Sequence, residues 1–539
     1  MASVARGRCG AAPGVESVPP AASEAPAVPL VAALPAAIET RRERALQAAL
    51  DAVRLPLTRL VRSVADRLTT QPREVSLATL EVEVRDLLVA LGRDLLTEVV
   101  RLRGTGYRGP SYVCPCGVRL EFKELAPLQQ RTWFGTITLE RAVYAGEGCH
   151  ERAHHVPVDA AWALLGAVAG PATLPDPDGG TLTPVAPGTG PARLSPAFAA
   201  VAVEFGARLP FAAAARLLDL AVGPQAHLAP NTIGTYTKAA GRVRGAQEEA
   251  ARVRTQPPSR AERRAVFDTP VPDRPATAPG TLVVSMDGAL ERTADGWKEV
   301  KLGAVYDLVT RVRHGERVWA VGAKTYTATL AAAQDFGRQL LAVAQRRGLG
   351  WAHQVAVLGD GAKWIWKLAA RRFPQAAQIV DWYHAREHLW GLAQLLYGES
   401  TAAAWTWLET LAGELWVAPT AEAVAIVAHA AEEAWATPRK DLPAETPRRT
   451  KARHREVAKA LAYFTANASR MRYGAFRDQG LPVGSGVVEG GCQSVLHTRL
   501  KRPGACWRID SAEHLVRACA VLSSDSVAAC PHPWDRLAS

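Results

Sequence analysis

Short, continuous apolar runs stand out in the second half of the chain, at residues 282–286, 355–358 and 377–380. Runs of this length, bounded by polar or glycine residues, are typical of strands buried on both faces. Two more strands are predicted near 298–306 and 318–321, and helices near 331–346 and 364–368. Because strands and helices alternate, we expect an α/β domain, placed at residues 281–525.

Residues 390–475 have a different pattern, with no segment typical of a strand. Trp405, Leu408, Leu411 and Leu415 recur at spacings of three and four, as on the buried face of a packed helix. We therefore predict a helical insertion at about 390–475 within the α/β domain.

The N-terminal region is predicted to be helical from residue 39 to 105. Its first part, 39–68, is basic and interrupted at Pro56, and its second part carries an apolar stripe from Leu80 to Leu95. A helical hairpin that packs on its own domain or on a second subunit would give this pattern. A region that contacts DNA directly is the alternative.

Residues 195–254 predict three short helices joined by tight turns, beginning at the capping pair Ser195-Pro196. This arrangement resembles a helix-turn-helix, in which the last helix enters the major groove of DNA. The side chains then closest to the bases are Asn231, Thr232, Thr235 and Lys238. A plain helical bundle gives the same pattern.

Composition marks the segments between these units. Residues 1–38 are rich in alanine, proline and valine but lack the unbroken apolar core of a signal peptide, so they are predicted to be a disordered leader. Residues 161–194 and 255–280 contain many prolines and are predicted to be linkers. Residues 526–539 form a short tail.

Three acidic residues occupy suggestive positions. Asp287 and Asp360 each follow an apolar run and precede a glycine, as at the end of a buried strand. Glu489 follows the loop residues 484–486 and opens a helix whose apolar face includes Cys492. A cluster of three carboxylates without cations among them would bind Mg²⁺ or Mn²⁺. For any one Asp-Gly pair taken alone, a simple turn is the alternative.

These acids belong to a set of motifs that resembles a known family. The motifs are Asp287-Gly288, residues 359–362, residues 381–388, and residues 484–489 followed by Arg499-Leu500-Lys501. Together they resemble the DDE transposases of bacterial insertion sequences, most closely the ISKra-type group, a relative of the Mutator-like superfamily.

The resemblance implies an RNase H-like catalytic core with Asp287 on its first strand, Asp360 at its fourth and Glu489 on a late helix after the insertion. It also implies two bound metal ions, DNA as the partner, a homo-oligomer that holds two DNA ends, and a bacterial, nucleoid-associated location.

Two histidines follow the third apolar run. His384 and His388 are four residues apart on a predicted helix, so they can share one face. Hydrogen-bonding support for the acidic cluster is one role for this pair, and a direct role near DNA or metal is the other.

A second candidate metal site lies at residues 106–160. Cys114, Cys116, Cys149 and His150 form two clusters separated by predicted strands, which is the layout of a zinc ribbon. The family resembled normally has a further cysteine at the position of Ala145 or Gly146, so a metal-free remnant is the alternative.

The charge agrees with a nucleic-acid partner. The chain has 64 Lys and Arg against 52 Asp and Glu, a formal charge of +12, which favours binding to polyphosphates. Arg499, Lys501 and Arg502 follow the helix of Glu489 and are predicted to contact DNA phosphates. The eight cysteines are few and scattered, which favours a reducing cytoplasm. No apolar stretch of about 18 residues predicts a membrane span.

These features favour a transposase that cuts and joins DNA through a DDE triad. Two alternatives remain: a metal-dependent nuclease of the same fold that acts in repair or recombination, and a transposase-derived DNA-binding protein that no longer cuts.

Overall fold

The computed structural model describes residues 33–70, 76–114, 116–147, 154–161, 174–175, 181–182, 193–254, 278–436 and 446–525. Over these residues the chain is a multidomain α/β protein with one antiparallel and one mixed sheet as its two main sheets. The predicted leader up to residue 32, most of both predicted linkers and the tail from residue 526 lie outside the described residues.

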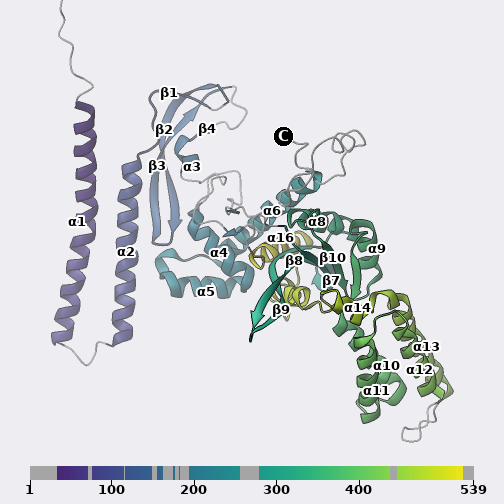
Figure 1. The fold of residues 1–539 in the computed structure, drawn as a ribbon. Helices are drawn as coiled ribbons and strands as arrows, with labels where there is room; N and C mark the ends of the chain where they lie inside the picture. Colours follow the sequence, from purple (N-terminus) through teal and green to yellow (C-terminus); the bar gives the residue numbers. More distant parts are fainter. Residues whose placement is uncertain are drawn as a thin grey trace, which may run out of the picture.

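The N-terminal unit is a hairpin of two long helices, α1 (Ala33–Thr70) and α2 (Leu77–Arg103) (Figure 1). The side chain of Ser76 caps α2, and Arg67 pairs with Glu83 across the hairpin. Helix α1 begins before the predicted boundary at residue 39 and continues through Pro56, where we expected a break. Because α1 packs along α2, tertiary contact offsets the one backbone hydrogen bond that proline cannot make.

The next unit is a four-stranded antiparallel sheet in the order β1-β2-β3-β4, with a short helix beside β3. Its elements are β1 (Ser111–Val113), β2 (Arg119–Thr132), β3 (Gly135–Ala145), β4 (His154–His155) and α3 (Pro157–Ala161). Cys114 and Cys116 lie in the turn between β1 and β2. Cys149 and His150 lie outside the described residues, so the zinc ribbon stays a prediction.

Three helices lead into the largest domain: α4 (Pro196–Arg208), α5 (Phe211–Val222) and α6 (Pro230–Arg254). The side chain of Ser195 accepts a hydrogen bond from the backbone of Phe198, as its capping role predicts. The remaining short elements before the largest domain are η1 (Pro224–Ala226), β5 (Leu174–Pro175) and β6 (Thr181–Leu182).

The central sheet has five strands in the order β11-β10-β7-β8-β9. They are β7 (Thr281–Thr293), β8 (Gly296–Arg313), β9 (Glu316–Thr329), β10 (Gln354–Gly359) and β11 (Ala377–Val380). Strands β7, β8 and β9 form an antiparallel meander, whereas β10 and β11 run parallel to β7. All five strands overlap segments predicted from the sequence.

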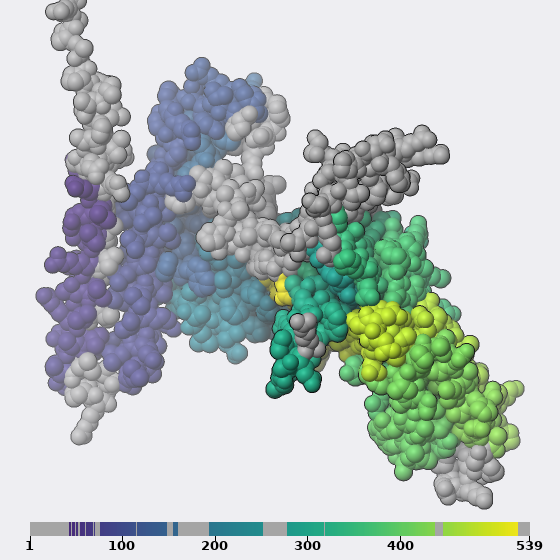
Figure 2. Space-filling view, viewed as in Figure 1, coloured from purple at the N-terminus to yellow at the C-terminus, as the bar shows by residue number. Residues whose placement is uncertain are grey.

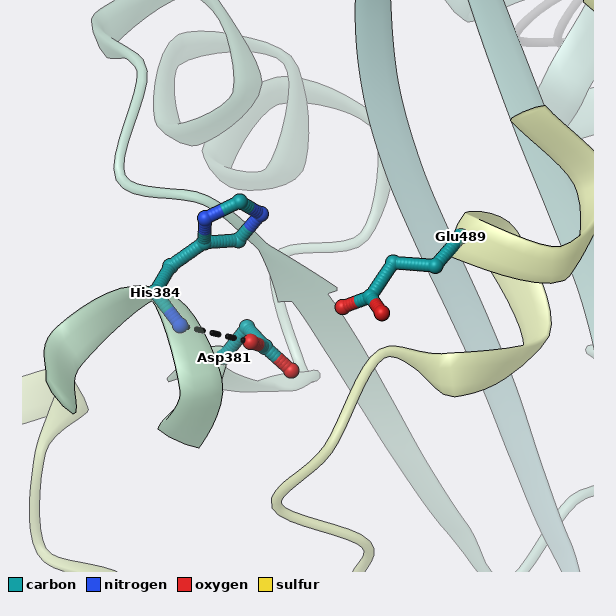
Figure 3. Close-up of side chains that lie close together, drawn as sticks. All are labelled: Asp381, His384 and Glu489. Carbon is teal, nitrogen blue, oxygen red and sulfur yellow. Dashed lines mark hydrogen bonds between the residues drawn. The ribbon is translucent and has the colours of Figure 1, made fainter. Parts of the chain in front are cut away.

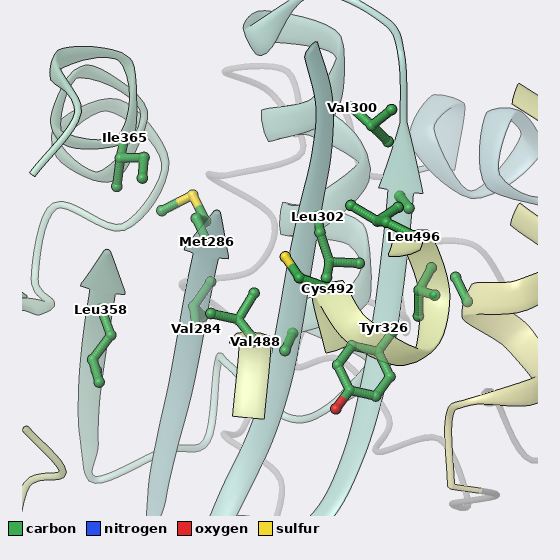
Figure 4. Close-up of a cluster of buried hydrophobic side chains, with 14 of the residues drawn as sticks. Val284, Met286, Val300, Leu302, Tyr326, Leu358, Ile365, Val488, Cys492 and Leu496 are labelled. Atoms are coloured by element: carbon green, nitrogen blue, oxygen red, sulfur yellow. The ribbon is translucent and has the colours of Figure 1, made fainter. Parts of the chain in front are cut away.

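Helices cover the central sheet, so its middle strands are buried on both faces. The covering elements include α8 (Ala333–Arg346), α9 (Lys363–Arg372), α15 (Gly486–Gly491), the π-helix η3 (Cys492–His497) and α16 (Ile509–Leu522). Figure 4 shows Val488, Cys492 and Leu496 packed against Val284 and Leu302 of the sheet. This contact sets the position of the helix that carries Glu489.

Residues 390–475 contain helices and no strand among those described, as predicted, and they project from the sheet (Figures 1 and 2). The elements are α10 (Trp382–Tyr397), α11 (Ala402–Val417), α12 (Ala423–Ala436), α13 (Pro447–Asn467), η2 (Ala468–Arg470) and α14 (Tyr473–Asp478). Among the described helices, none combines the length and the apolar character needed to cross a membrane.

Candidate metal centre

Three aspartates lie at the same level of three neighbouring strands of the central sheet: Asp287 is within β7, and Asp360 and Asp381 come directly after β10 and β11. Gly359 of β10 is in register with Met286 of β7 and Val380 of β11, and all three strands run parallel. The next residue along each strand is Asp287, Asp360 or Asp381. Since neighbouring strands are about 4.8 Å apart, the three residues form a row across the sheet at the level where β10 and β11 end.

Asp287 is held by two donors. One carboxylate oxygen accepts the backbone N–H of Gly288 at 2.7 Å, and the other accepts the thiol of Cys492 at 3.1 Å. Cys492 is buried and comes three residues after Glu489. The thiol contact therefore ties the Glu489 segment to the first aspartate of the row.

Asp360 sits in the middle of the row. Its side chain accepts the backbone N–H of Ala362 at 2.8 Å, and its own carbonyl accepts the hydroxyl of Tyr463 at 2.9 Å. Burial raises the pKa of the Asp360 carboxyl; the Ala362 N–H opposes this rise, and the negative charge of Asp287 adds to it. A divalent cation beside Asp360 would remove this repulsion.

Asp381 is fully buried and joins two segments. One carboxylate oxygen of Asp381 accepts the backbone N–H of His384, and this hydrogen bond caps the start of α10. The other carboxylate oxygen accepts the backbone N–H of Ser485. The backbone of Trp382 also donates to Val483. Asp381 thus fixes the loop that leads to Glu489 against the start of α10.

Glu489 is exposed and extends from α15 toward Asp381 and His384 (Figure 3). Potential ligand atoms of these three side chains all lie within 4.8 Å of one another, and no other such group occurs among the described residues. The hydroxyl of Ser485 donates to Glu489 at 2.8 Å. The described arrangement therefore brings Glu489 close to the third aspartate of the row.

The donor set suits a hard divalent cation. Asp381 and Glu489 belong to the group of potential ligands, whereas Asp287 and Asp360 lie beside Asp381 by strand register and outside that group. None of these four carboxylates pairs with a lysine or arginine among the described residues. Carboxylate oxygens are the preferred ligands of Mg²⁺ and Mn²⁺. The cluster is therefore consistent with divalent metal binding.

The two candidate supporting histidines have different surroundings. His384 lies within the cluster, and its imidazole is 3.6 Å from the carboxylate of Glu387. His388 stacks on Tyr463 with ring centroids 3.7 Å apart, and desolvation lowers its pKa. Of the pair, His384 is placed to contact a cation.

The predicted DNA-binding residues of α6 lie on its first three turns. Asn231 and Thr235 are exposed, whereas Thr232 and Lys238 are half-buried. Further along, α6 packs against α16 and α8, and the backbone of Gly241 approaches His514 closely. The first turns of α6 therefore present Asn231 and Thr235 at the surface before the helix reaches its contacts with α16 and α8.

The prediction that Arg499 contacts phosphate is wrong in this structure. Arg499 is 3% exposed, donates to the carbonyl of Gly206 at 2.9 Å and stacks on the rings of Phe211 and Trp507. Through these contacts Arg499 holds α4 and α5 on the domain that contains the central sheet. Burial lowers the pKa of the Arg499 guanidinium group. Lys501 and Arg502 are exposed, so their contact with DNA phosphates stays a prediction.

The structure adds residues that the sequence analysis did not select. Asp381 follows an apolar run as Asp360 does, so the same signal could have identified it. Cys492 reaches the carboxylate of Asp287 and Tyr463 reaches the backbone carbonyl of Asp360 from segments far away in the sequence, and no local pattern indicates these two contacts. Ser485 is four residues before Glu489, so its contact is local.

The fold and site define a multidomain α/β protein with an acidic cluster suited to a divalent cation. No protein-family model matches the chain, and no curated protein matches it. Among solved structures, the chain is similar to the Drosophila P element transposase strand transfer complex, at 12% identity and a TM-score of 0.21. The match covers 52% of this chain and 92% of that one. A similarity this low does not define the fold or the function.

Proposed function

We propose that this protein is a DDE transposase, which binds the ends of a mobile DNA element and catalyses DNA strand cleavage and strand transfer. The observation that carries the proposal is the strand register that sets Asp287 beside Asp360, with the helix of Glu489 tied to Asp287 through Cys492. In this proposal the five-stranded sheet is an RNase H-like core. Asp287 is on its first strand, Asp360 follows its fourth, and Glu489 comes after the helical insertion.

Asp287, Asp360 and Glu489 are proposed to hold two Mg²⁺ or Mn²⁺ ions. Such a pair of ions activates an attacking oxygen and stabilises the departing one in phosphodiester cleavage. The residues around the acids keep them in place: Cys492 orients Asp287, Ala362 orients Asp360, and Ser485 holds Glu489. In this structure Glu489 is grouped with Asp381 and His384, so in the proposal its side chain turns toward Asp287 and Asp360 when the ions bind.

The test is incubation of the protein with its own flanking DNA and Mg²⁺, with cleavage and joining measured on a denaturing gel. We expect the wild type to cut at the element ends and to join the ends to a target. Glu489→Gln and Asp360→Asn should lose cleavage but still retard the same DNA in a gel-shift assay. Glu414→Gln, an exposed glutamate on α11, serves as the control and should cut normally.

Cleavage without joining, or at sites unrelated to the ends, would instead favour the resident nuclease. DNA binding without cleavage would favour the derived DNA-binding protein. Full cleavage by Asp360→Asn would refute the assignment of the triad. A cytoplasmic, DNA-associated homo-oligomer is the state in which the proposed reaction would take place.

A further inference from the structure

Helix α1 buries little surface for its length. It has 38 residues and packs along α2, with no comparable contact to another described element (Figure 1). None of its described side chains is buried. Pro56 also removes one hydrogen bond from the middle of the helix. Since the packing of an apolar face supplies most of the stability of a helix in a protein, α1 needs a further partner.

Four exposed apolar side chains share one face of α1. They recur at spacings of four and seven residues, which keeps them on one side of a helix. These residues, called the α1 stripe, are 44% to 59% exposed: Leu46, Leu50, Leu57 and Val61. Leu55 is 56% exposed but lies on the opposite side of the helix by the same spacing. The hairpin therefore leaves the α1 stripe half open.

A second apolar stripe follows α2. Its six residues, called the α2 stripe, are 41% to 72% exposed: Leu77, Val84, Leu88, Leu95, Val99 and Leu102. On one side of the α2 stripe, Glu83 pairs with Arg67 of α1; on the other side, Gly92 packs on the ring of Phe134. The α2 stripe is thus the floor of a groove, and a hollow of about 500 Å³ beside Phe134 marks its first half.

The charges of the two helices favour a second copy of the hairpin as the partner that covers these stripes. Helix α1 contains seven arginines and four acidic residues, whereas α2 contains five acidic residues and four arginines. Two α1 helices would therefore repel each other, and α1 of one copy is attracted to α2 of another. The pairing of Arg67 with Glu83 follows the same preference within one chain.

The apolar surface is large enough for a stable dimer. Ten side chains, each about half exposed, offer roughly 500 Å² of apolar surface per copy. A standard interface takes about 800 Å² from each partner, and about 65% of a homodimer interface is apolar. The two stripes therefore supply the apolar share of such an interface.

We propose that two copies of this protein associate through their helical hairpins, with the α1 stripe of each copy lying in the α2 groove of the other. The contact is reciprocal, so a two-fold axis relates the copies and the assembly is closed. The four helices form a bundle that buries both stripes. This inference uses the hairpin alone, so the association needs neither DNA nor metal and does not depend on the proposed function.

The test measures the mass of the full-length protein by size-exclusion chromatography with light scattering, in EDTA and without DNA. We expect twice the 57.6 kDa of one chain. Leu50→Glu places a charge in the α1 stripe and Leu88→Glu places one in the α2 stripe, so each variant should have the mass of one chain. Leu55→Glu is the matched control, because it adds the same charge at an equally exposed leucine on the opposite side of α1. It should remain a dimer.

Leu57→Ala guards against the unfolding of α1. Alanine favours a helix and adds no charge, so the helical content measured by circular dichroism should not fall. The lost contact occurs twice in a symmetric dimer, and we expect the dissociation constant measured by sedimentation equilibrium to rise about tenfold or more.

Two results would overturn the proposal: a wild type with the mass of one chain at micromolar concentration, or a folded Leu50→Glu variant that stays a dimer. A dimer that never cuts DNA would refute the proposed function alone. A wild-type monomer that cuts and joins DNA would refute only the association through the hairpins.

Discussion

Replacing Cys492 by alanine would remove the only side-chain donor to Asp287 among the described residues. The thiol is 5% exposed and lies 3.1 Å from the carboxylate oxygen, so no water would easily replace it. A hydrogen bond to a charged group contributes about 1.5–3 kcal/mol. Because a thiol is a weak donor, we expect the lower value, which corresponds to about a tenfold loss of metal affinity.

Two assays separate this effect from a loss of fold. Binding of Mn²⁺, followed by electron paramagnetic resonance, reports the site without requiring cleavage, and the Mg²⁺ concentration for half-maximal cleavage reports the reaction. Cys519→Ala is the matched control, since Cys519 is 2% exposed and donates to the carbonyl of Ala207 far from the acids. Cys492→Ser keeps a donor and should restore most of the affinity. Equal Mn²⁺ affinity in folded Cys492→Ala and wild type would refute the reasoning.

Three further changes test the electrostatics and packing. Asp360→Asn should raise the melting temperature in EDTA at neutral pH. Burial raises the pKa of the Asp360 carboxyl, so its ionised form destabilises the folded state increasingly as pH rises, and asparagine removes that charge. A lower melting temperature of the variant would contradict this reasoning. Burial raises the pKa of Glu291 to about 6 from 4.5, so its stabilising contribution is complete below pH 4.5 and is lost as pH rises through 6. Glu291→Gln should therefore reduce the loss of unfolding free energy between pH 4.5 and 7.5 by about 2 kcal/mol in urea titrations. Arg499→Ala should lower the unfolding free energy by about 3 kcal/mol. Lys501→Ala should leave stability unchanged and should reduce the slope of log DNA affinity against log salt concentration by about 1.

The strands of the central sheet were predictable because a strand buried on both faces consists of a continuous run of apolar residues, and such a run is visible in the sequence. An apolar run ending in Asp-Gly predicts both the strand and the position of its acid at Asp360, which directly follows β10. At Asp287 the same pattern predicts the strand but not its end, because β7 continues to Thr293 in its pairing with β8. The helices of residues 390–475 were predictable for a similar reason, since Leu408, Leu411 and Leu415 recur at helical spacing and are all buried.

Contacts between distant segments were not predictable from local pattern. Arg499 belongs to a basic run that suggested an exposed surface, yet its partners Gly206 and Phe211 come nearly three hundred residues earlier in the chain. The proximity of Glu489 to Asp381 depends equally on the loop that Asp381 holds through Ser485. Such contacts follow from the packing of the whole domain, which periodicity does not describe.

The length of helix α6 and its packing on α16 determine how far its first turns lie from the acidic cluster. It is 25 residues, or about 37 Å, long, and its exposed beginning at Asn231 continues into a segment clamped against α16. The buried Arg499 fastens the helices beside it to the same domain. Among the described residues, the packing of α6 on α16 holds the start of α6 at a constant distance from the acidic cluster. If DNA binds at the start of α6 and the proposed cleavage takes place, the cut would therefore fall at a constant distance from the bound segment.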